Sequence, residues 1–290
     1  SRVPDPIVPL GLFRNRSFTV SVVSMFLVGF GFLGAVVFLP RWFQAVAGAS
    51  ATESGYNILP LLLGLIVSAI VSGQIVARTG HYKALIFGSL VVLAVGLYLM
   101  TQLRVDTNRQ LMWLWMLITG IGIGPSFAVF TLVVQNAVSP DRIGVATSSL
   151  TFFQQIGGTI GLTISSTIFA TRIVAELPVQ LLAAGVPQPV VDQFAKGGDT
   201  GAITGTGDLG AAILAQIPPA LRPQFEPLIP AIVDGIHQAF TIALASTFWV
   251  GIVGAIVAAG AVLLLREEPM RSTFEIEVPQ AASEAEPAVG

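Results

Sequence analysis

The stretch Ala84–Leu103 reads ALIFGSLVVLAVGLYLMTQL and contains no Asp, Glu, Lys or Arg. An α-helix needs about 20 mainly apolar residues to cross the hydrocarbon core of a bilayer. A strand of a membrane barrel is about half as long and alternates apolar with polar residues, and this stretch does not alternate. The stretch therefore predicts a transmembrane α-helix.

Five more runs of the same kind lie before and after it. The six predicted transmembrane helices are Phe18–Leu39, Tyr56–Val76, Ala84–Leu103, Leu111–Val134, Val145–Thr171 and Gln238–Leu265. None of them has a charged residue in its interior. The sequence therefore predicts an all-α integral membrane protein whose six helices are embedded in a lipid bilayer.

The overall composition agrees with this fold class and excludes several others. The chain of 290 residues is 53% hydrophobic and only 10% charged, whereas soluble domains have about 25% charged residues. Its net charge of −2 provides no basic surface for a nucleic-acid partner. It has no cysteine, which excludes disulfides and thiolate metal sites.

The sequence contains no pattern typical of catalysis. Its two histidines, His81 and His237, fall in connections on opposite sides of the predicted membrane, so they cannot share a metal ion. Neither a Ser, His and Asp set nor a cluster of acids at one membrane depth is predicted. We therefore expect no enzyme, no metal site and no cofactor.

Basic residues in the short connections predict the orientation in the membrane. Seven of them fall on one side: Arg14, Arg16, Arg78, Lys83, Arg142, Arg266 and Arg271. Four fall on the other side: Arg41, Arg104, Arg109 and Arg172. Because short cytoplasmic loops carry the excess of Lys and Arg, we expect a multi-pass protein of the cell (plasma or inner) membrane with both termini in the cytoplasm.

Three segments lie outside the predicted bundle of residues 18–265. Residues 1–17 are predicted to be a cytoplasmic lead-in. Residues 172–237 are predicted to form an extracytoplasmic loop, in which the apolar stretches Val190–Phe194 and Leu209–Ile217 indicate short helices. Residues 266–290 are predicted to be a cytoplasmic, mostly disordered tail because they are rich in Ala, Glu and Pro.

An internal repeat divides the six predicted helices into two sets of three. Gly29-Phe-Gly-Phe32 in the first helix matches Gly120-Ile-Gly-Ile123 in the fourth, and Ser50–Gly55 before the second helix matches Ser139–Gly144 before the fifth. Two sets of three helices must insert with opposite orientations, since three is odd. The pattern predicts a 3+3 inverted repeat of the kind found in many secondary transporters.

The fifth predicted helix carries a polar stripe. Residues three and four positions apart lie on one face of a helix, and here that face consists of Ser148, Thr151, Gln155, Thr159, Thr163 and Ser166. One interpretation is that the stripe lines a water-filled path for a small-molecule substrate, because a polar face is costly in lipid. The other is that the hydroxyls bond their own helix and Gln155 bonds a neighbouring helix.

Glycines form a different face of the same helix. Gly157, Gly158 and Gly161 fall together, and Gln154 falls beside them. Small residues on one face allow a neighbouring backbone to approach closely. We therefore expect this face to pack against another helix, with Gln154 directed toward that helix and Gln155 toward the polar stripe.

The fourth predicted helix has a similar feature. Gly120 and Gly124 share a face, and Pro125 follows. Proline removes a backbone donor and favours a kink, so the region can be a hinge near a transport path. Close helix packing is the simpler interpretation.

Two aromatic residues of the first helix are further candidates for the substrate cavity. Phe26 and Phe30 lie one turn apart. Aromatic rings can contact a lipophilic or cationic substrate, although such rings more often face lipid or the protein core.

Several stretches resemble the major facilitator superfamily, and within it the 14-helix drug:proton antiporter branch. Leu12–Phe18 (LFRNRSF) is similar to the entry to the first helix of that branch's C-terminal half, and Ser54–Pro60 (SGYNILP) to the start of its next helix. Gly144–Ser148 (GVATS) followed by Phe152–Gly158 (FFQQIGG) resembles its late-helix block. Their order and spacing match as well as their residues.

The connection between the second and third helices resembles the loop motif of the superfamily. Gly73, Arg78 and Gly80 match the motif, and Lys83 ends the loop. Ala77 stands where the stronger copy of the motif has Asp, and Gln154 stands where many relatives carry Arg. With Arg142, the basic residues Arg78 and Lys83 are candidates for a cytoplasmic interface.

The resemblance implies that this chain is the C-terminal half of a secondary active transporter. It implies export of drugs or other lipophilic small molecules by proton antiport, through rocking of two helical halves around a central site. It also implies that the first, second, fourth and fifth helices face the cavity, and that the partner is an N-terminal helical half of the same chain.

Proton coupling places a further requirement on the protein. It usually needs a membrane-embedded carboxylate, and no predicted helix has one. Glu53, the nearest acid, lies at the edge of the second helix, where the helix dipole alone accounts for it. The coupling carboxylate is therefore expected outside this chain. The alternative function is a self-contained six-helix channel or an accessory membrane subunit.

Overall fold

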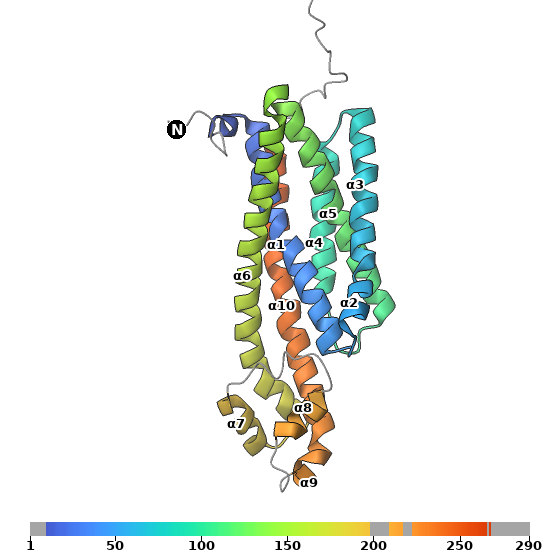
Figure 1. The fold of residues 1–290 in the computed structure, drawn as a ribbon, viewed down its shortest axis with the longest axis vertical. Coiled ribbons are helices and arrows are strands. Elements are labelled where there is room, and N and C mark those ends of the chain that lie inside the picture. Colours follow the sequence, from blue (N-terminus) through green and yellow to red (C-terminus); the bar gives the residue numbers. More distant parts are fainter. Residues whose placement is uncertain (1–9, 198–208, 217–221, 266, 268–290) are drawn as a thin grey trace, which may run out of the picture.

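The computed structural model describes residues 10–197, 209–216, 222–265 and 267. These residues form a tall bundle of helices, without a strand in the described part of the chain (Figure 1). The long helices are α1 (Arg16–Ala45), α3 (Leu59–Thr79), α4 (Lys83–Met100), α5 (Arg109–Ala137), α6 (Ile143–Ala183) and α10 (Ile229–Leu263). Within the described part of the chain, six spans are long and apolar enough to cross a membrane, which confirms the predicted fold class.

Short helices connect the long ones. Before α1, η1 (Leu10–Arg14) forms a single turn, and α2 (Ala51–Asn57) precedes α3. The remaining short elements are η2 (Pro140–Arg142), α7 (Gln188–Gly197), α8 (Leu209–Gln216), α9 (Arg222–Phe225) and η3 (Glu226–Leu228).

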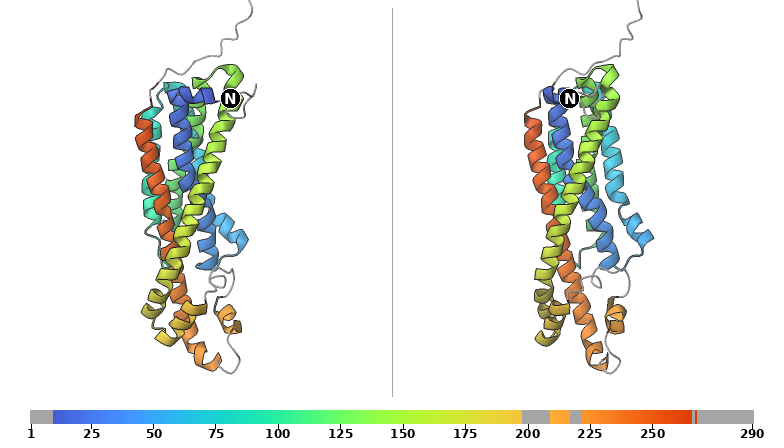
Figure 2. Two further views of the ribbon diagram at one scale, coloured as in Figure 1. Left: turned by 90° about the vertical axis from the view of Figure 1, so that its left-hand side faces the viewer. Right: turned by 60° about the vertical axis from the view of Figure 1, so that its left-hand side comes forward.

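The ends of the last two long helices differ from the prediction. The predicted loop 172–237 is shorter in the structure, because α6 continues to Ala183 and α10 already begins at Ile229. The two extended helices project beyond the rest of the bundle and carry α7, α8 and α9 (Figure 2). Arg172, Glu176 and Asp234 interrupt the apolar pattern, so an apolar run alone could not reveal these helical turns.

Other boundaries shift less. α1 begins at Arg16, inside the predicted lead-in 1–17, and residues 1–9 of that lead-in lie outside the described residues. The predicted disordered tail 266–290 lies outside them as well, except for Glu267.

The long helices pack in an exchanged pattern that matches an inverted repeat. The first set is α1, α3 and α4, and the second is α5, α6 and α10. α3 packs along α5 of the other set, and α6 packs along α1; likewise α4 packs along α5, and α10 along α1. The second and third helices of each set thus pack along the first helix of the other set.

Close backbone contacts at two glycines repeat in the same way. A Cβ atom on Gly29 of α1 would meet the Gln154 carbonyl and the Gly158 amide of α6. A Cβ atom on Gly120 of α5 would meet the Leu61 carbonyl and the Leu65 amide of α3. The partner groups are four residues apart in both cases, so equivalent glycines set equivalent helix distances in the two sets.

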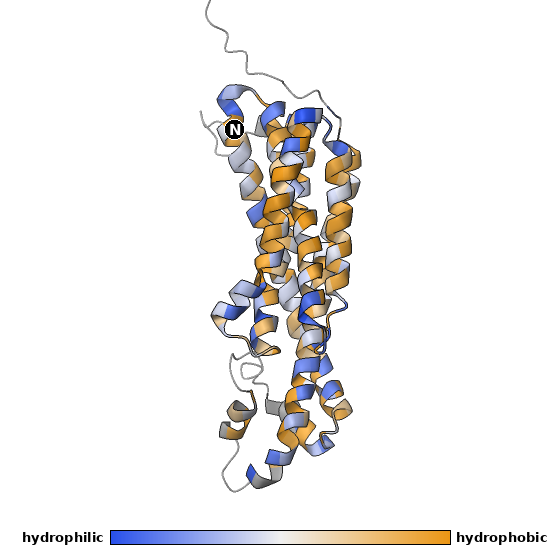
Figure 3. Ribbon diagram, turned by 90° about the vertical axis from the view of Figure 1, so that its right-hand side faces the viewer, coloured by the Kyte–Doolittle hydropathy of each residue, from blue (hydrophilic) through white to orange (hydrophobic). Residues whose placement is uncertain are grey.

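The outside of the bundle is apolar along its middle. Figure 3 shows hydrophobic residues over the middle of the helices and hydrophilic residues gathered toward the two ends. Large apolar side chains are exposed there, for example Ile66 and Ile70 on α3 and Ile256 on α10. Such a surface is suited to lipid, because water would not solvate it.

The two ends of the described chain lie together. The η1 helix and the last turn of α10 are at the same end of the bundle (Figures 1 and 2), which we call the terminal end. The opposite end, which carries α7 to α9, is called the far end. This arrangement follows from six crossings, since an even number returns the chain to its starting side.

Candidate functional site

The polar stripe lies on an open side of α6. All six of its residues are exposed: Ser148, Thr151, Gln155, Thr159, Thr163 and Ser166. The threonine hydroxyls donate hydrogen bonds to carbonyls of their own helix four residues earlier, as Thr159 does to Gln155 at 2.9 Å and Thr163 to Thr159 at 2.9 Å. The stripe is therefore not used for helix packing, and its three threonine hydroxyls already have partners in their own helix.

The two adjacent glutamines face different surroundings. The Gln154 side chain is buried and only 5% exposed. The Gln155 side chain is exposed and makes no hydrogen bond within the described part of the chain. An amide without a partner costs several kcal/mol in hydrocarbon, so Gln155 is the member of the stripe that most needs water or another protein group.

The glycine face of α6 lies against α1. A Cβ atom on Gly157 would meet the carbonyl group of Phe26, and one on Gly161 would meet Phe30. A Cβ atom on Gly158 would meet the side chain of Leu33. The two helix backbones are thus nearly in contact along this face.

The glycines of α5 have the same relation to α3. A Cβ atom on Gly124 would meet the Leu65 carbonyl and the Ser68 hydroxyl. Pro125 is buried inside α5, and this helix runs without interruption from Arg109 to Ala137. In the structure, Gly120 and Gly124 are helix-packing positions.

The two phenylalanines of α1 form a ring pair. The centroids of Phe26 and Phe30 are 5.4 Å apart, and both side chains are half-buried. Phe30 lies between the glycine face of α6 and Gly254 of α10, which makes it mainly a packing residue. Phe26 remains the aromatic candidate for the cavity.

The residues of the loop motif gather at the terminal end of the bundle. Gly80 has φ +70° and ends α3 in the left-handed conformation, which favours glycine. Arg78 is exposed. A Cβ atom on Gly73 would lie 3.8 Å from the Cβ of Ala128 in α5, at ordinary van der Waals distance. Arg142 is exposed and pairs with its neighbour Asp141 at 3.6 Å.

Lys83 has a function that its sequence position does not indicate. Its Nζ donates a hydrogen bond to the Leu263 carbonyl at 2.8 Å, and its backbone amide donates one to Glu267 Oε1 at 3.0 Å. A cation near the C-terminus of a helix is favourable, because the last carbonyls there have no partner in the helix. Lys83 thus ties the start of α4 to the end of α10.

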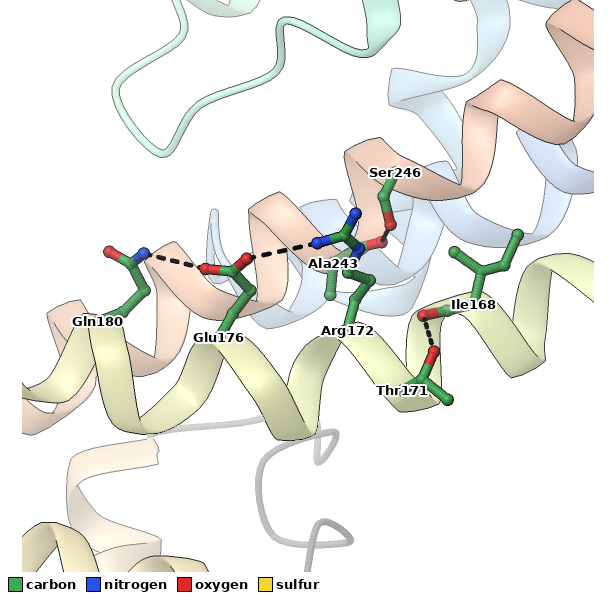
Figure 4. Close-up of polar contacts among 7 residues, drawn as sticks. All are labelled: Ile168, Thr171, Arg172, Glu176, Gln180, Ala243 and Ser246. Atoms are coloured by element: carbon green, nitrogen blue, oxygen red, sulfur yellow. Dashed lines mark hydrogen bonds and ion pairs between the residues drawn. The ribbon is translucent and has the colours of Figure 1, made fainter.

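Polar residues also gather where α6 passes beside α10 (Figure 4). Arg172 Nη1 lies 3.9 Å from Glu176 Oε1, and Gln180 Nε2 donates to Glu176 Oε2 at 3.3 Å. Ser246 of α10 donates to the Ala243 carbonyl at 2.6 Å. Arg172 extends from α6 toward α10 in this view.

The architecture defines the class of protein. A bundle of membrane-spanning helices, built from two exchanged sets of three with glycine contacts between them, is the arrangement of transporters with inverted repeats. Residues 2–162 match the family model of the Major Facilitator Superfamily. The chain belongs to this superfamily.

Three relatives show what the chain is similar to. It is 34% identical to the uncharacterized MFS-type transporter Rv1877 of Mycobacterium tuberculosis over 269 residues, which are 93% of this chain and 35% of that protein. It is 37% identical to the multidrug transporter protein MdtP of Bacillus subtilis over 59% of this chain and 32% of MdtP. It is 29% identical to the tetracenomycin C resistance and export protein of Streptomyces glaucescens, over 98% of this chain and 51% of that protein.

These relatives are longer than the chain. The chain spans between about a third and about a half of their lengths. The names of these proteins describe transporters and not enzymes.

Proposed function

We propose that this chain is the C-terminal half of a longer transporter that exports drugs or other lipophilic small molecules. Relatives that are named as a multidrug transporter and as a resistance and export protein support this proposal. The length of those relatives supports the view that a second helical half completes the protein. The 14-helix branch of the superfamily is part of the same proposal.

The observation that carries the proposal is the exposed amide of Gln155. Gln155 lies 12 residues from the start of α6 at Ile143, which corresponds to about 18 Å along the helix axis. That distance places it deep in a bilayer whose core is about 30 Å thick. Lipid cannot satisfy the amide, whereas a water-filled cavity between two halves can.

In the proposed mechanism, the open side of α6 lines one wall of the central cavity. Gln155 offers a donor and an acceptor to substrate or water, and Thr151 and Thr159 line the wall one turn away on each side. Phe26 supplies apolar contact area from α1. The two halves then rock about the site, and inward proton movement drives export, with the proton-carrying carboxylate located in the other half.

Cysteine labelling in membranes tests the cavity. The chain has no native cysteine, so a thiol reagent labels this chain only at the introduced cysteine. We expect a small water-soluble thiol reagent to label Thr151→Cys and Gln155→Cys, because both positions face the cavity. Ile156→Cys is the matched control and should stay unlabelled, since that half-buried residue lies outside the stripe. Protection of both stripe positions, or labelling of Ile156→Cys alone, would refute the cavity.

Transport in vesicles tests the activity and the coupling. We expect Gln155→Leu to reduce drug export several-fold while the amount of folded protein is unchanged. Export should also stop when a protonophore collapses an imposed pH gradient. Ion conductance that persists without any gradient-driven export would instead support the alternative of a self-contained channel.

A further inference from the structure

A polar cavity opens at the far end of the bundle, away from the polar stripe. It has a volume of about 750 Å³ and lies between the connection from α4 to α5, Arg172 of α6 and one side of α10. Among the described residues, four charged ones line it, two of each sign: Arg104, Asp106, Arg172 and Asp234. A ligand that carries both a negative and a positive group would match this set of charges.

The charged groups have few partners within the part of the protein that the structure describes, and Asp234 Oδ2 accepts only a long hydrogen bond from Gln238 Nε2, at 3.5 Å. Arg104, Asp106 and Asp234 are exposed, and no ion pair involves any of them in the described part of the chain. The contact of Arg172 with Glu176 is long, at 3.9 Å, and the Arg172 side chain is 57% exposed. A phosphate between Arg104 and Arg172 would give both guanidinium groups a stronger, charge-assisted partner.

An apolar groove lies on the membrane side of this cavity. It has a volume of about 480 Å³ and runs between α4 and α10. Ala94, Ala255 and Gly260 keep the space between the helices open, and Phe87 and Tyr98 lie on its α4 side. From Phe87 to Tyr98, an α-helix rises about 16 Å, which is about half of a 30 Å hydrocarbon core. The groove therefore has the length of one bilayer leaflet.

Two aromatic rings join the groove to the cavity. Tyr98 lines the groove and Trp249 lines the cavity. Their ring centroids are 6.4 Å apart in an edge-to-face arrangement. Tyr and Trp are enriched at the level of lipid headgroups, so the change from apolar groove to polar cavity occurs where a membrane surface is expected.

We propose that the cavity and the groove together bind one zwitterionic phospholipid of the leaflet at the far end. Its phosphate binds Arg104 and Arg172, its ammonium group binds Asp106 and Asp234, and one acyl chain lies in the groove between α4 and α10. The charge balance of the cavity favours this lipid over an anionic one. The proposal depends only on insertion in a membrane and not on what the protein transports.

Native mass spectrometry of the protein purified from membranes tests the head-group contacts. The probes are phosphatidylethanolamine and phosphatidylglycerol, each exchanged into nanodiscs. We expect retention of one phosphatidylethanolamine molecule, and about tenfold weaker binding in Arg104→Ala/Arg172→Ala, because two charge-assisted contacts are lost. The matched control is Arg41→Ala/Arg109→Ala, which removes two exposed arginines of the same end outside the cavity and should bind lipid like the parent protein.

A second pair of variants tests the acyl chain. A side chain at Gly260 would meet nothing within 4 Å, so Gly260→Phe is expected to fold and to fill part of the groove. It should weaken lipid binding several-fold. Val253→Phe is the control on α10, because Val253 is 58% exposed and lies outside the groove.

Three results would overturn the proposal. Equal binding of phosphatidylglycerol and phosphatidylethanolamine would show unselective lipid contact. Unchanged lipid binding in both test variants would place the lipid elsewhere. Equal binding of soluble glycerophosphoethanolamine, insensitive to Gly260→Phe, would indicate a site for a small polar molecule. Melting curves of each variant in detergent verify that the compared proteins are folded.

Discussion

At the scale of single residues, glycines determine how closely the helices approach. In α6, the position of Gly157 leaves no room for a Cβ atom, because the Phe26 carbonyl of α1 occupies that space. Gly88 of α4, in contrast, is exposed and has nothing within 4 Å of a Cβ atom. A glycine is therefore required for the helix contact at position 157, whereas position 88 has room for a larger side chain.

This contrast gives a matched pair of substitutions. Gly157→Ala should lower the free energy of unfolding by about 1–3 kcal/mol, because the backbones of α1 and α6 must separate. Gly88→Ala should leave it unchanged or raise it by about 0.5–1 kcal/mol, since alanine favours helix over glycine. Unfolding in detergent, followed by circular dichroism, measures both. Similar effects of the two substitutions would contradict the contact between α1 and α6.

The two glutamines show what the helical period can predict about single residues. The helical period predicts that Gln154 lies with the glycines and Gln155 with the hydroxyls, and the structure agrees for the buried Gln154 and the exposed Gln155. The period does not say which helix Gln154 meets. The backbone carbonyl of Gln154 lies beside Gly29 of α1, a residue far away in the sequence.

At the scale of the helical elements, the start of α1 is linked to the end of α5. Asn15 is the N-cap of α1, and its Oδ1 accepts hydrogen bonds from the amides of Ser17 at 2.8 Å and Phe18 at 3.2 Å. Its Nδ2 donates to the Ala137 carbonyl at 2.9 Å. One side chain thus satisfies backbone groups at the ends of two helices.

Substitution of Asn15 separates these two contributions. Asn15→Ala should lower the free energy of unfolding by about 1–2 kcal/mol, because the cap and the bond to α5 are both lost. Asn15→Asp should cost less, since it keeps the cap acceptors and loses only the bond to Ala137. Asn108→Ala is the control, because Asn108 caps α5 with a single bond to Gln110. Equal melting temperatures for Asn15→Ala and Asn15→Asp would show that the cap contributes nothing, and an Asn15→Asp variant as stable as the parent would show the same of the bond to Ala137.

At the scale of the whole molecule, the exchanged packing of two sets of helices leaves one side of α6 open. The neighbours of α6 are mainly α1 and α10. The residues of its polar stripe are exposed and pack against neither of these helices. An apolar surface covers most of the remaining outside. The polar stripe interrupts this apolar surface, and the proposed second helical half would cover it.

The orientation of the whole molecule is also testable. A tag placed after Arg271 should be accessible only from the cytoplasm, because seven basic residues of the short connections fall on that side and four on the other. Protease protection of sealed inside-out and right-side-out vesicles measures the accessibility. Cleavage from the outside would reverse the predicted topology and place the far end of the bundle in the cytoplasm.

The sequence alone determined the six membrane helices and the polar stripe, because a charge-free apolar run in lipid has to satisfy its own backbone bonds and a helical period fixes which residues share a face. Its glycine pairs also indicated the repeat. Only the tertiary structure decided that Gly157 meets Phe26, that Lys83 binds the end of α10, and that Arg104, Arg172 and Asp234 line one cavity. It also decided that α6 and α10 extend past the apolar runs. These features depend on contacts between segments far apart in the chain, and no local spacing encodes which segments will meet.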